Sequence, residues 1–170
     1  MKEEVNEQTT PELKELDMKH IKEGYVTPHT AKLMQRLGFN VACKLCYVGR
    51  VLVDREAAEI ERWENIVPAP TIGVAQKWLI KEKECNVIPR QGASKKAEER
   101  GWKEAWYVEY YNYSGDEIIN DGFDGYNEWL YKTYNEALEA GIHDWCYILW
   151  KHSEDDESTD REIPTSTTGV

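Results

Sequence analysis

The stretch "TIGVAQKWLIKEKECNVIP", residues 71–89, decides the fold because it contains a helix and a strand in immediate succession. Thr71 is a favourable N-cap residue, and the apolar residues after it recur at the spacing of one helical face. From Cys85 the pattern changes to "CNVIPR", which predicts a short strand. The apolar face of the predicted helix consists of Val74, Ala75, Trp78 and Leu79.

Two segments that precede this stretch share one helix signature, a Thr-Pro pair at the start and a glycine at the end. They are "TPELKELDMKHIKEG", residues 10–24, and "TPHTAKLMQRLGF", residues 27–39. Thr caps a helix, Pro suits its first turn, and Gly closes its C-terminus in a left-handed conformation. The first segment has only a thin apolar stripe, so it is either a docked helix or a flexible segment. The second presents a full apolar face of Ala31, Leu33, Met34 and Leu37.

The residues between these helices and residue 71 predict extended chain with one helical turn. "ACKLCYVGRVLVD", residues 42–54, is rich in Val and predicts a strand that stops at Asp54. Residues 55–70 predict a helical turn near 57–63, followed by extended chain into Pro68. After residue 90, "QGASKKAEERG" has the small, polar composition of a connecting loop.

The C-terminal third predicts a hairpin and a long helix. In residues 102–119, alternation places Trp106, Val108 and Tyr110 on one face and Tyr107, Glu109 and Tyr111 on the other, with a turn at Ser114-Gly115. The last helix begins at Thr133 with a capping box. Its apolar stripe consists of Ala137, Leu138, Ile142, Trp145, Cys146 and Leu149.

The order of these elements predicts an α+β fold, with helices packed on one mainly antiparallel sheet. We expect a single small domain over residues 25–152. Residues 1–24 form a flexible N-terminal segment or a helix, and residues 153–170 form a disordered acidic tail.

The formal charge of −11 is concentrated in the two ends of the chain. Residues 1–23 carry a net −3 and residues 153–170 a net −5, which leaves only −3 for the residues between them. Acidic, polar ends are typical of disordered tails. We therefore expect no nucleic-acid partner. An acidic nucleic-acid mimic that inhibits a host DNA-binding protein is kept as one alternative function.

The composition also indicates a compartment. No apolar run approaches the roughly 18 residues that span a bilayer, and the N-terminal residues lack the apolar core of a secretory signal. We therefore expect a cytoplasmic protein without a membrane partner, in which the four cysteines are reduced.

Two short-spaced pairs of residues resemble half-sites for zinc. "CKLC" contains Cys43 and Cys46, and "HDWC" contains His143 and Cys146. Structural zinc needs four such ligands, so a small zinc-binding module that uses these four residues is a second alternative function. Against it, Tyr47 follows Cys46 where a zinc knuckle prefers glycine, and Cys146 lies in the apolar stripe of the last helix. The favoured interpretation is core packing, with no metal and no cofactor.

The sequence contains no G-x-S-x-G, P-loop or G-x-G-x-x-G motif, so we expect a protein that is not an enzyme. The aromatic run "WYVEYYNY", residues 106–113, allows two interpretations. Alternating aromatic residues pack across strands, but exposed tyrosines also favour protein interfaces. Tyr107, Tyr111 and Tyr113 are therefore candidate interaction residues.

Four segments together resemble a family of small uncharacterised proteins of phages and prophages of gut bacteria, of the Bacteroidetes type. They are "TAKLMQRLGFNVAC", "PAPTIGVAQKWLIKEKECNVIP", "WYVEYYNYSGDE" and "TYNEALEAGI", within residues 28–150. The resemblance implies a mobile-element protein and that Cys43, but not Cys46, occupies a typical cysteine position. We expect a non-enzymatic protein that binds a bacterial host protein or a phage protein.

Overall fold

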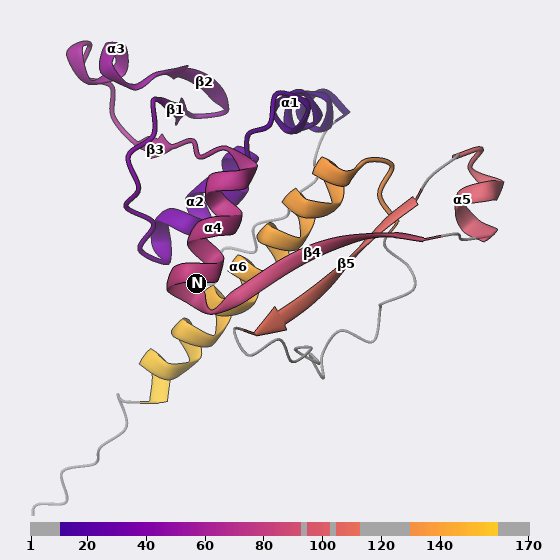
Figure 1. Ribbon diagram of the computed structural model, residues 1–170. Coiled ribbons are helices and arrows are strands. Elements are labelled where there is room, and N and C mark those ends of the chain that lie inside the picture. The colour runs from indigo at the N-terminus through magenta and orange to yellow at the C-terminus, as the bar shows by residue number, and fades with distance from the viewer. Residues whose placement is uncertain (1–10, 93–94, 103–104, 113–129, 160–170) are drawn as a thin grey trace, which may run out of the picture.

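The computed structural model describes residues 11–92, 95–102, 105–112 and 130–159, and it shows an α+β fold (Figure 1). Helices α2 (Pro28–Arg36), α4 (Ile72–Lys83) and α6 (Tyr134–Thr159) lie together. They pack beside a two-stranded antiparallel sheet of β4 (Cys85–Gly92) and β5 (Ala105–Asn112). A three-stranded antiparallel sheet and the short helix α3 (Arg55–Ile60) form a lobe above the helices.

The stretch from residue 71 to residue 89 has the predicted structure. The Thr71 side chain accepts a hydrogen bond from the Val74 N–H at 3.3 Å, which caps α4. The helix ends at Glu84, whose φ of 53° reverses the chain into β4. The Gln76 amide then donates to the Val87 carbonyl at 2.8 Å and fastens helix to strand. The predicted apolar face is confirmed, since Ala75, Trp78 and Leu79 are buried and Val74 packs against them.

Helix α6 covers one face of the β4–β5 sheet. The predicted alternation in β5 is confirmed: Tyr110 stacks on Trp145 of α6 with ring centroids 5.7 Å apart, and Val108 packs on the same core. The closest approach is at Gly141, because a Cβ added there would lie 2.6 Å from Val108 Cγ1 and nearer still to Val87 Cγ1. The glycine therefore sets how closely α6 approaches both strands.

Helix α1 (Pro11–Lys22) also matches a predicted helix, and its C-terminal turn is docked. His20 and Ile21 are buried, and the His20 Nε2–H donates to the Arg50 carbonyl at 3.2 Å. An ion pair of 2.7 Å between Arg50 and Asp17 adds a second link. Of the two interpretations of residues 1–24, the docked helix is the one observed for residues 11–22.

Two sequence predictions need correction, and a third is not tested by the described residues. Residues 42–54 form a hairpin of β1 (Leu45–Val48) and β2 (Val51–Asp54) rather than one strand, because Gly49 adopts a left-handed φ of 63° that turns the chain. The predicted loop 91–101 contains the short helix α5 (Lys95–Glu99). In the described residues β5 pairs along its length with β4, and the turn predicted at Ser114-Gly115 lies outside them.

The predicted C-terminal boundary also differs. The capping box is present, since Thr133 Oγ1 accepts from the Glu136 N–H at 3.2 Å. However, α6 continues to Thr159 and so passes the boundary expected at residue 152. The rest of the expected tail, residues 160–170, lies outside the described residues.

A buried carboxylate joins α6 to the start of α2. Glu139 Oε1 accepts hydrogen bonds from the Thr27 N–H at 3.0 Å and from the Thr30 hydroxyl at 2.6 Å. Thr27 is the N-cap of α2, so the carboxylate sits at the positive end of the helix dipole. The adjacent Val26 accepts a hydrogen bond from the Tyr47 hydroxyl at 2.5 Å, which ties the three-stranded sheet to the same point.

The approach at Gly141 leads to a stability prediction. Gly141→Ala gains helix propensity of about 1 kcal/mol, but its new methyl group overlaps two valine side chains that have little freedom to move. We expect a net loss of about 1–3 kcal/mol in the free energy of unfolding, measured by urea titration. Gly73→Ala is the matched control, because a Cβ at Gly73 has no neighbour within 4 Å. Equal effects of the two substitutions would show that α6 does not approach the sheet this closely.

The hydrogen bonds of Glu139 lead to a second prediction. Glu139→Ala leaves the buried Thr27 N–H and Thr30 hydroxyl without their acceptor, so we expect the free energy of unfolding to fall by about 3 kcal/mol. Glu154→Ala, at an exposed position of the same helix, should change it by less than about 0.5 kcal/mol. A similar small change in both variants would contradict the anchoring role of Glu139.

Candidate functional site

The structure does not bring the four candidate zinc ligands together. Cys46 lies in β1 and Cys43 precedes it, whereas His143 and Cys146 lie on α6. Among the described residues, which include all four, no three His, Cys, Asp or Glu side chains gather where they could hold a metal ion. His143 is instead beside His29 of α2, with ring centroids 5.0 Å apart.

The cysteines occupy environments that favour neutral thiols. Burial raises the pKa of both Cys85 and Cys146 to about 12. Burial also raises the pKa of Cys43 and of Cys46, although Arg55 opposes it in both cases. Because the thiolate is the nucleophile and the metal ligand, these thiols are poorly suited to either role near neutral pH.

Two of the three candidate tyrosines lie on the side of the β4–β5 sheet that faces away from α6. Tyr107 and Tyr111 share this side with Glu109, and Tyr113 lies outside the described residues. The Glu109 carboxylate accepts hydrogen bonds from Arg90 Nε and from the Tyr111 hydroxyl, both at 2.8 Å. The Arg90 guanidinium is therefore engaged across the strands, and the Tyr111 hydroxyl is engaged with Glu109 of its own strand.

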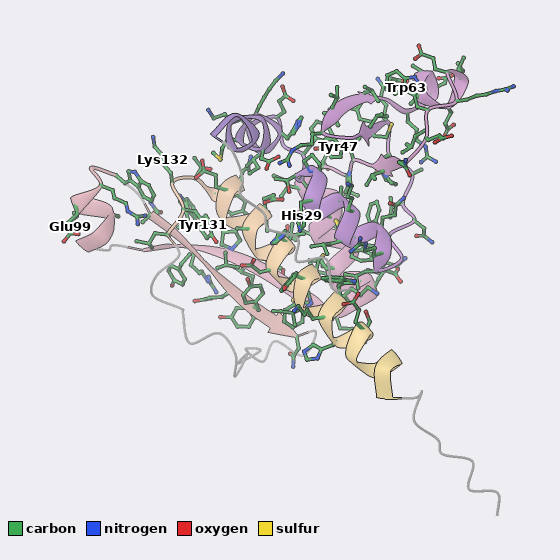
Figure 2. All side chains as sticks on the ribbon, turned by 180° about the vertical axis from the view of Figure 1, so that it is seen from behind. His29, Tyr47, Trp63, Glu99, Tyr131 and Lys132 are labelled. Atoms are coloured by element: carbon green, nitrogen blue, oxygen red, sulfur yellow. The ribbon has the colours of Figure 1, made fainter. Side chains whose placement is uncertain are left out.

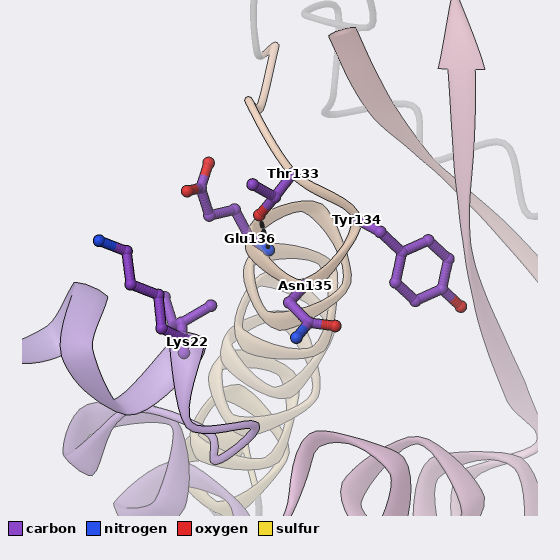
Figure 3. A pocket seen from close by; sticks show the side chains of 6 residues that line it. Lys22, Thr133, Tyr134, Asn135 and Glu136 are labelled. Carbon is purple, nitrogen blue, oxygen red and sulfur yellow. Dashed lines mark hydrogen bonds between the residues drawn. The ribbon is translucent and has the colours of Figure 1, made fainter. Parts of the chain in front are cut away.

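A shallow recess of about 380 Å³ lies where the end of α1 meets the start of α6 (Figure 3). Most of its polar groups form hydrogen bonds with one another at the start of α6. Thr133 Oγ1 accepts from the Glu136 N–H, and Glu136 Oε2 accepts from the Lys132 N–H at 3.0 Å. Lys22 lines the opposite side. This arrangement presents no nucleophile paired with a base, so it does not support a catalytic function.

The three-stranded sheet is apolar on both faces, which is unusual for a sheet at the surface. Its strands are ordered β2–β1–β3, where β3 is Ile66–Pro68. Residues paired across the strands lie on the same face. The inner face, which packs on the core, contains Leu45, Tyr47, Leu52 and Val67. The opposite face, here called the outer face, consists of Cys46, Val48, Val51, Val53, Ile66 and Pro68.

The outer face is sheltered at one end only. Helix α3 (Arg55–Ile60) contacts β2, and its Ala58 is buried. At this end Cys46 is completely buried. At the other end Val51 is 61% exposed, and the neighbouring Val48 and Ile66 are half-buried. The α3 end of the outer face is therefore covered by the chain itself, and at the other end Val51 is exposed.

Two large apolar side chains project from the covering segment. Ile60, the last residue of α3, is 74% exposed, and Trp63 in the following loop is 41% exposed. Figure 2 shows Trp63 at the far end of the lobe, whereas Tyr47 lies where the lobe meets the helices. Burying one such side chain contributes about 1.5–3 kcal/mol, so leaving both exposed forgoes a substantial stabilisation.

The loop that carries Trp63 has a defined conformation. The Asp54 side chain caps α3 by accepting from the N–H groups of Glu56 and Ala57, at 3.0 and 3.2 Å. The Trp63 N–H donates to the Ala58 carbonyl at 3.0 Å. Arg62 has a left-handed φ of 56°, a conformation that costs about 1–2 kcal/mol for a residue with a side chain. Arg62 therefore holds a strained conformation in the turn that leads to Trp63.

The outer face was not predicted from the sequence, although a signal was present. In "CYVGRVLVD" the apolar residues are continuous rather than alternating. A continuous run indicates a strand with two apolar faces. The turn at Gly49 was not predicted. Without this turn the segment is one strand, and its residues cannot be assigned to the two faces of a sheet.

Comparisons with protein-family models, with curated proteins and with solved structures found no match to this chain. Within the described part of the chain, no helix combines the length and the apolar character needed to cross a bilayer. The assignment of a function therefore depends on the geometry described above.

The Glu109 network leads to a prediction about pH. Burial raises the pKa of this carboxyl, but the hydrogen bonds from Arg90 and Tyr111 outweigh it and hold the pKa below its ordinary value of 4.5. A lowered folded pKa stabilises the fold above the unfolded pKa, and this contribution is lost as the carboxyl protonates. Glu109→Gln should therefore lower the unfolding midpoint near pH 7, and its difference from the wild type should shrink as the pH falls below 4.5.

Arg90→Gln is the control for this prediction, because it removes the other half of the ion pair. Its effect should have the same pH dependence, and the double variant should lose less than the sum of the two single losses. Thermal unfolding of the four proteins across the pH range measures all of these differences. A difference that does not change with pH would contradict the network.

Proposed function

We propose that this chain is a non-enzymatic binding protein that recognises another protein through the outer face of its three-stranded sheet. One observation carries the proposal: of the six large apolar side chains that are exposed among the described residues, three, Val51, Ile60 and Trp63, belong to this one lobe. Folded proteins rarely leave contiguous apolar surface exposed unless it binds something. Trp is also among the residues that most often dominate binding energy at interfaces.

The chemistry of the outer face favours a protein partner over a small molecule. Small-molecule sites are concave and combine apolar walls with a few polar groups that fix orientation. The outer face is a sheet surface whose own side chains are all apolar, and charged residues of α3 such as Glu56 and Glu59 border it. An apolar centre with a polar rim is the arrangement typical of protein interfaces.

The biological setting is part of the same proposal. The resemblance to phage and prophage proteins suggests that the partner is a protein of the bacterial host or of the phage. It also suggests that binding takes place in the bacterial cytoplasm. These two points rest on the quoted sequence segments, whereas the binding surface rests on the geometry of the lobe.

The proposal predicts that a single charge on the lobe, either on the outer face or at the end of α3, strongly weakens binding. Val51→Lys and Ile60→Glu place a charge at positions that are exposed in the free chain, so the fold should tolerate them. In affinity capture from host lysate at increasing lysate concentration, the wild-type chain should retain a saturable partner and both variants should lose it. The measured quantity is the half-saturation concentration, with an expected rise of at least about 30-fold.

Tyr147→Glu is the matched control for this experiment. Tyr147 is 40% exposed on α6 and lies outside the lobe, so this variant should bind like the wild type. Circular dichroism and thermal unfolding establish that all three variants are folded. If the lobe variants retain the same partner with the same half-saturation, or if no protein binds saturably, the proposed function is wrong.

A further inference from the structure

We propose that the partner binds by strand addition: an extended segment of the partner protein pairs with the free edge of β2 and becomes a fourth strand of the sheet in the lobe. This inference rests on the proposed function, because it names the part of the partner that meets the same lobe. Three features of the molecule support it: the direction of the backbone groups of β2, the open edge of this strand, and the exposure of Val51.

The backbone groups of β2 alternate between β1 and the free edge. The β1–β2 hairpin has a two-residue turn, so its first pair, Val48 and Val51, is hydrogen-bonded. The Arg55 N–H donates to the Lys44 carbonyl at 2.9 Å, which shows the same alternation four residues later. Every second residue from Val51 to Arg55 therefore bonds to β1. The backbone N–H and C=O of Leu52, which lies between them, point to the free edge.

The free edge of β2 is open at Leu52 and bounded at both ends. The strand order is β2–β1–β3, and Figure 1 shows β2 on the side of the lobe away from α2 and α4. Within the described residues the main contacts of β2 are with β1 and α3. At the turn, the Arg50 carbonyl already accepts from His20 Nε2–H at 3.2 Å. At the other end the chain turns into α3 at Arg55. An added strand is therefore centred on Leu52.

The free edges of β4 and β3 are closed, each by a glutamine and a proline. On β4, Gln76 donates to the Val87 carbonyl at 2.8 Å, and Pro89, which faces the same edge, has no N–H. On β3, Gln35 donates to a carbonyl of the strand at 3.4 Å, and Pro68 has no N–H. Prolines and occupied carbonyls prevent a further strand from pairing. At Leu52, β2 has neither.

An added strand would also cover the exposed part of the outer face. Residues paired across strands lie on the same face of a sheet. The partner residue opposite Leu52 therefore points to the inner face, and its two neighbours point to the outer face. One of these neighbours lies beside Val51, which is 61% exposed. We therefore expect an extended segment with apolar residues at alternate positions, which is the chemistry recognised by strand addition.

The length of the edge sets the expected strength of binding. Leu52 offers one donor and one acceptor, so the backbone contributes a single hydrogen-bonded pair. We expect an isolated segment to bind with a dissociation constant on the order of millimolar. The whole partner binds more tightly, because it also covers Ile60 and Trp63 of the same lobe.

A synthetic peptide of about seven residues, in which valine and threonine alternate between terminal lysines, tests the edge directly. In an NMR titration of the full chain, saturation with this peptide should slow hydrogen exchange of the Leu52 amide at least about tenfold, because this N–H gains an acceptor. The Val53 amide, which is bonded to β1 in both states, should not change. The same peptide with every backbone nitrogen methylated cannot pair and should not bind.

Two substitutions at Leu52 separate the backbone group from the side chain. Leu52→Pro removes the N–H and places a ring at the edge, and strands tolerate proline where the N–H faces away from the neighbouring strand. We expect it to raise the dissociation constant of the peptide at least about tenfold. Leu52→Val keeps the N–H and should bind within about threefold of the wild type. Circular dichroism establishes that both variants fold; if Leu52→Pro does not, amide exchange in the wild-type chain decides.

The outcomes separate this inference from the proposed function. If the peptide shows no saturable binding up to about 5 mM, or binds without slowing exchange of the Leu52 amide, strand addition is wrong. Loss of the lysate partner in Val51→Lys and Ile60→Glu would then leave the proposed function standing. If no lysate protein binds saturably, the proposed function is wrong, whereas protection of Leu52 by the peptide would still establish β2 as an edge that accepts a strand.

Discussion

The carboxylate of Glu139 connects α6 to the start of α2, and the arrangement of the other elements depends on this connection. It accepts hydrogen bonds from the Thr27 N–H and the Thr30 hydroxyl, so the start of α2 is held against the N-terminal part of α6. Val26, one residue earlier, donates its N–H to the Pro70 carbonyl at 3.2 Å and accepts from the Tyr47 hydroxyl. Residues 26–30 therefore join three parts of the molecule: α6, the turn that leads into α4, and the three-stranded sheet. Two residues beyond Glu139, Gly141 sets the contact between α6 and the β4–β5 sheet.

This junction also determines which face of the three-stranded sheet is available. Tyr47 is fully buried and faces the core, so the alternation of the strands directs Cys46 and Val48 away from it. Helix α3 is only six residues long and shelters one end of that outer face. A longer α3 would also have covered the end of the outer face at Val51. The exposure of Val51 is thus a consequence of where the sheet is anchored, although its neighbours Val48 and Ile66 are half-buried.

The sequence was informative where structure is decided locally. Thr71 and Thr27 as caps, glycine at helix ends, and the faces of α4, α6 and β5 follow from residues within one or two turns of each other. It was less informative where distant segments meet. The two candidate zinc pairs look alike in spacing, but β1 and α6 are arranged by tertiary packing that spacing does not encode. The outer face was missed for a related reason: without the turn at Gly49, "CYVGRVLVD" has no assigned faces, so its continuous apolar run indicated only a strand.

The central claim is that the outer face of the three-stranded sheet is part of a protein-binding surface. The most direct measurement is the solvent accessibility of the methyl groups of Val48, Val51 and Ile66, obtained by NMR with a soluble paramagnetic agent while the partner captured from host lysate is added in increasing amounts. Val41, 40% exposed and outside the outer face, provides the reference. We predict that the three methyl groups become protected as the partner saturates the chain, whereas Val41 does not change. Methyl groups whose accessibility stays the same at every partner concentration would contradict the account.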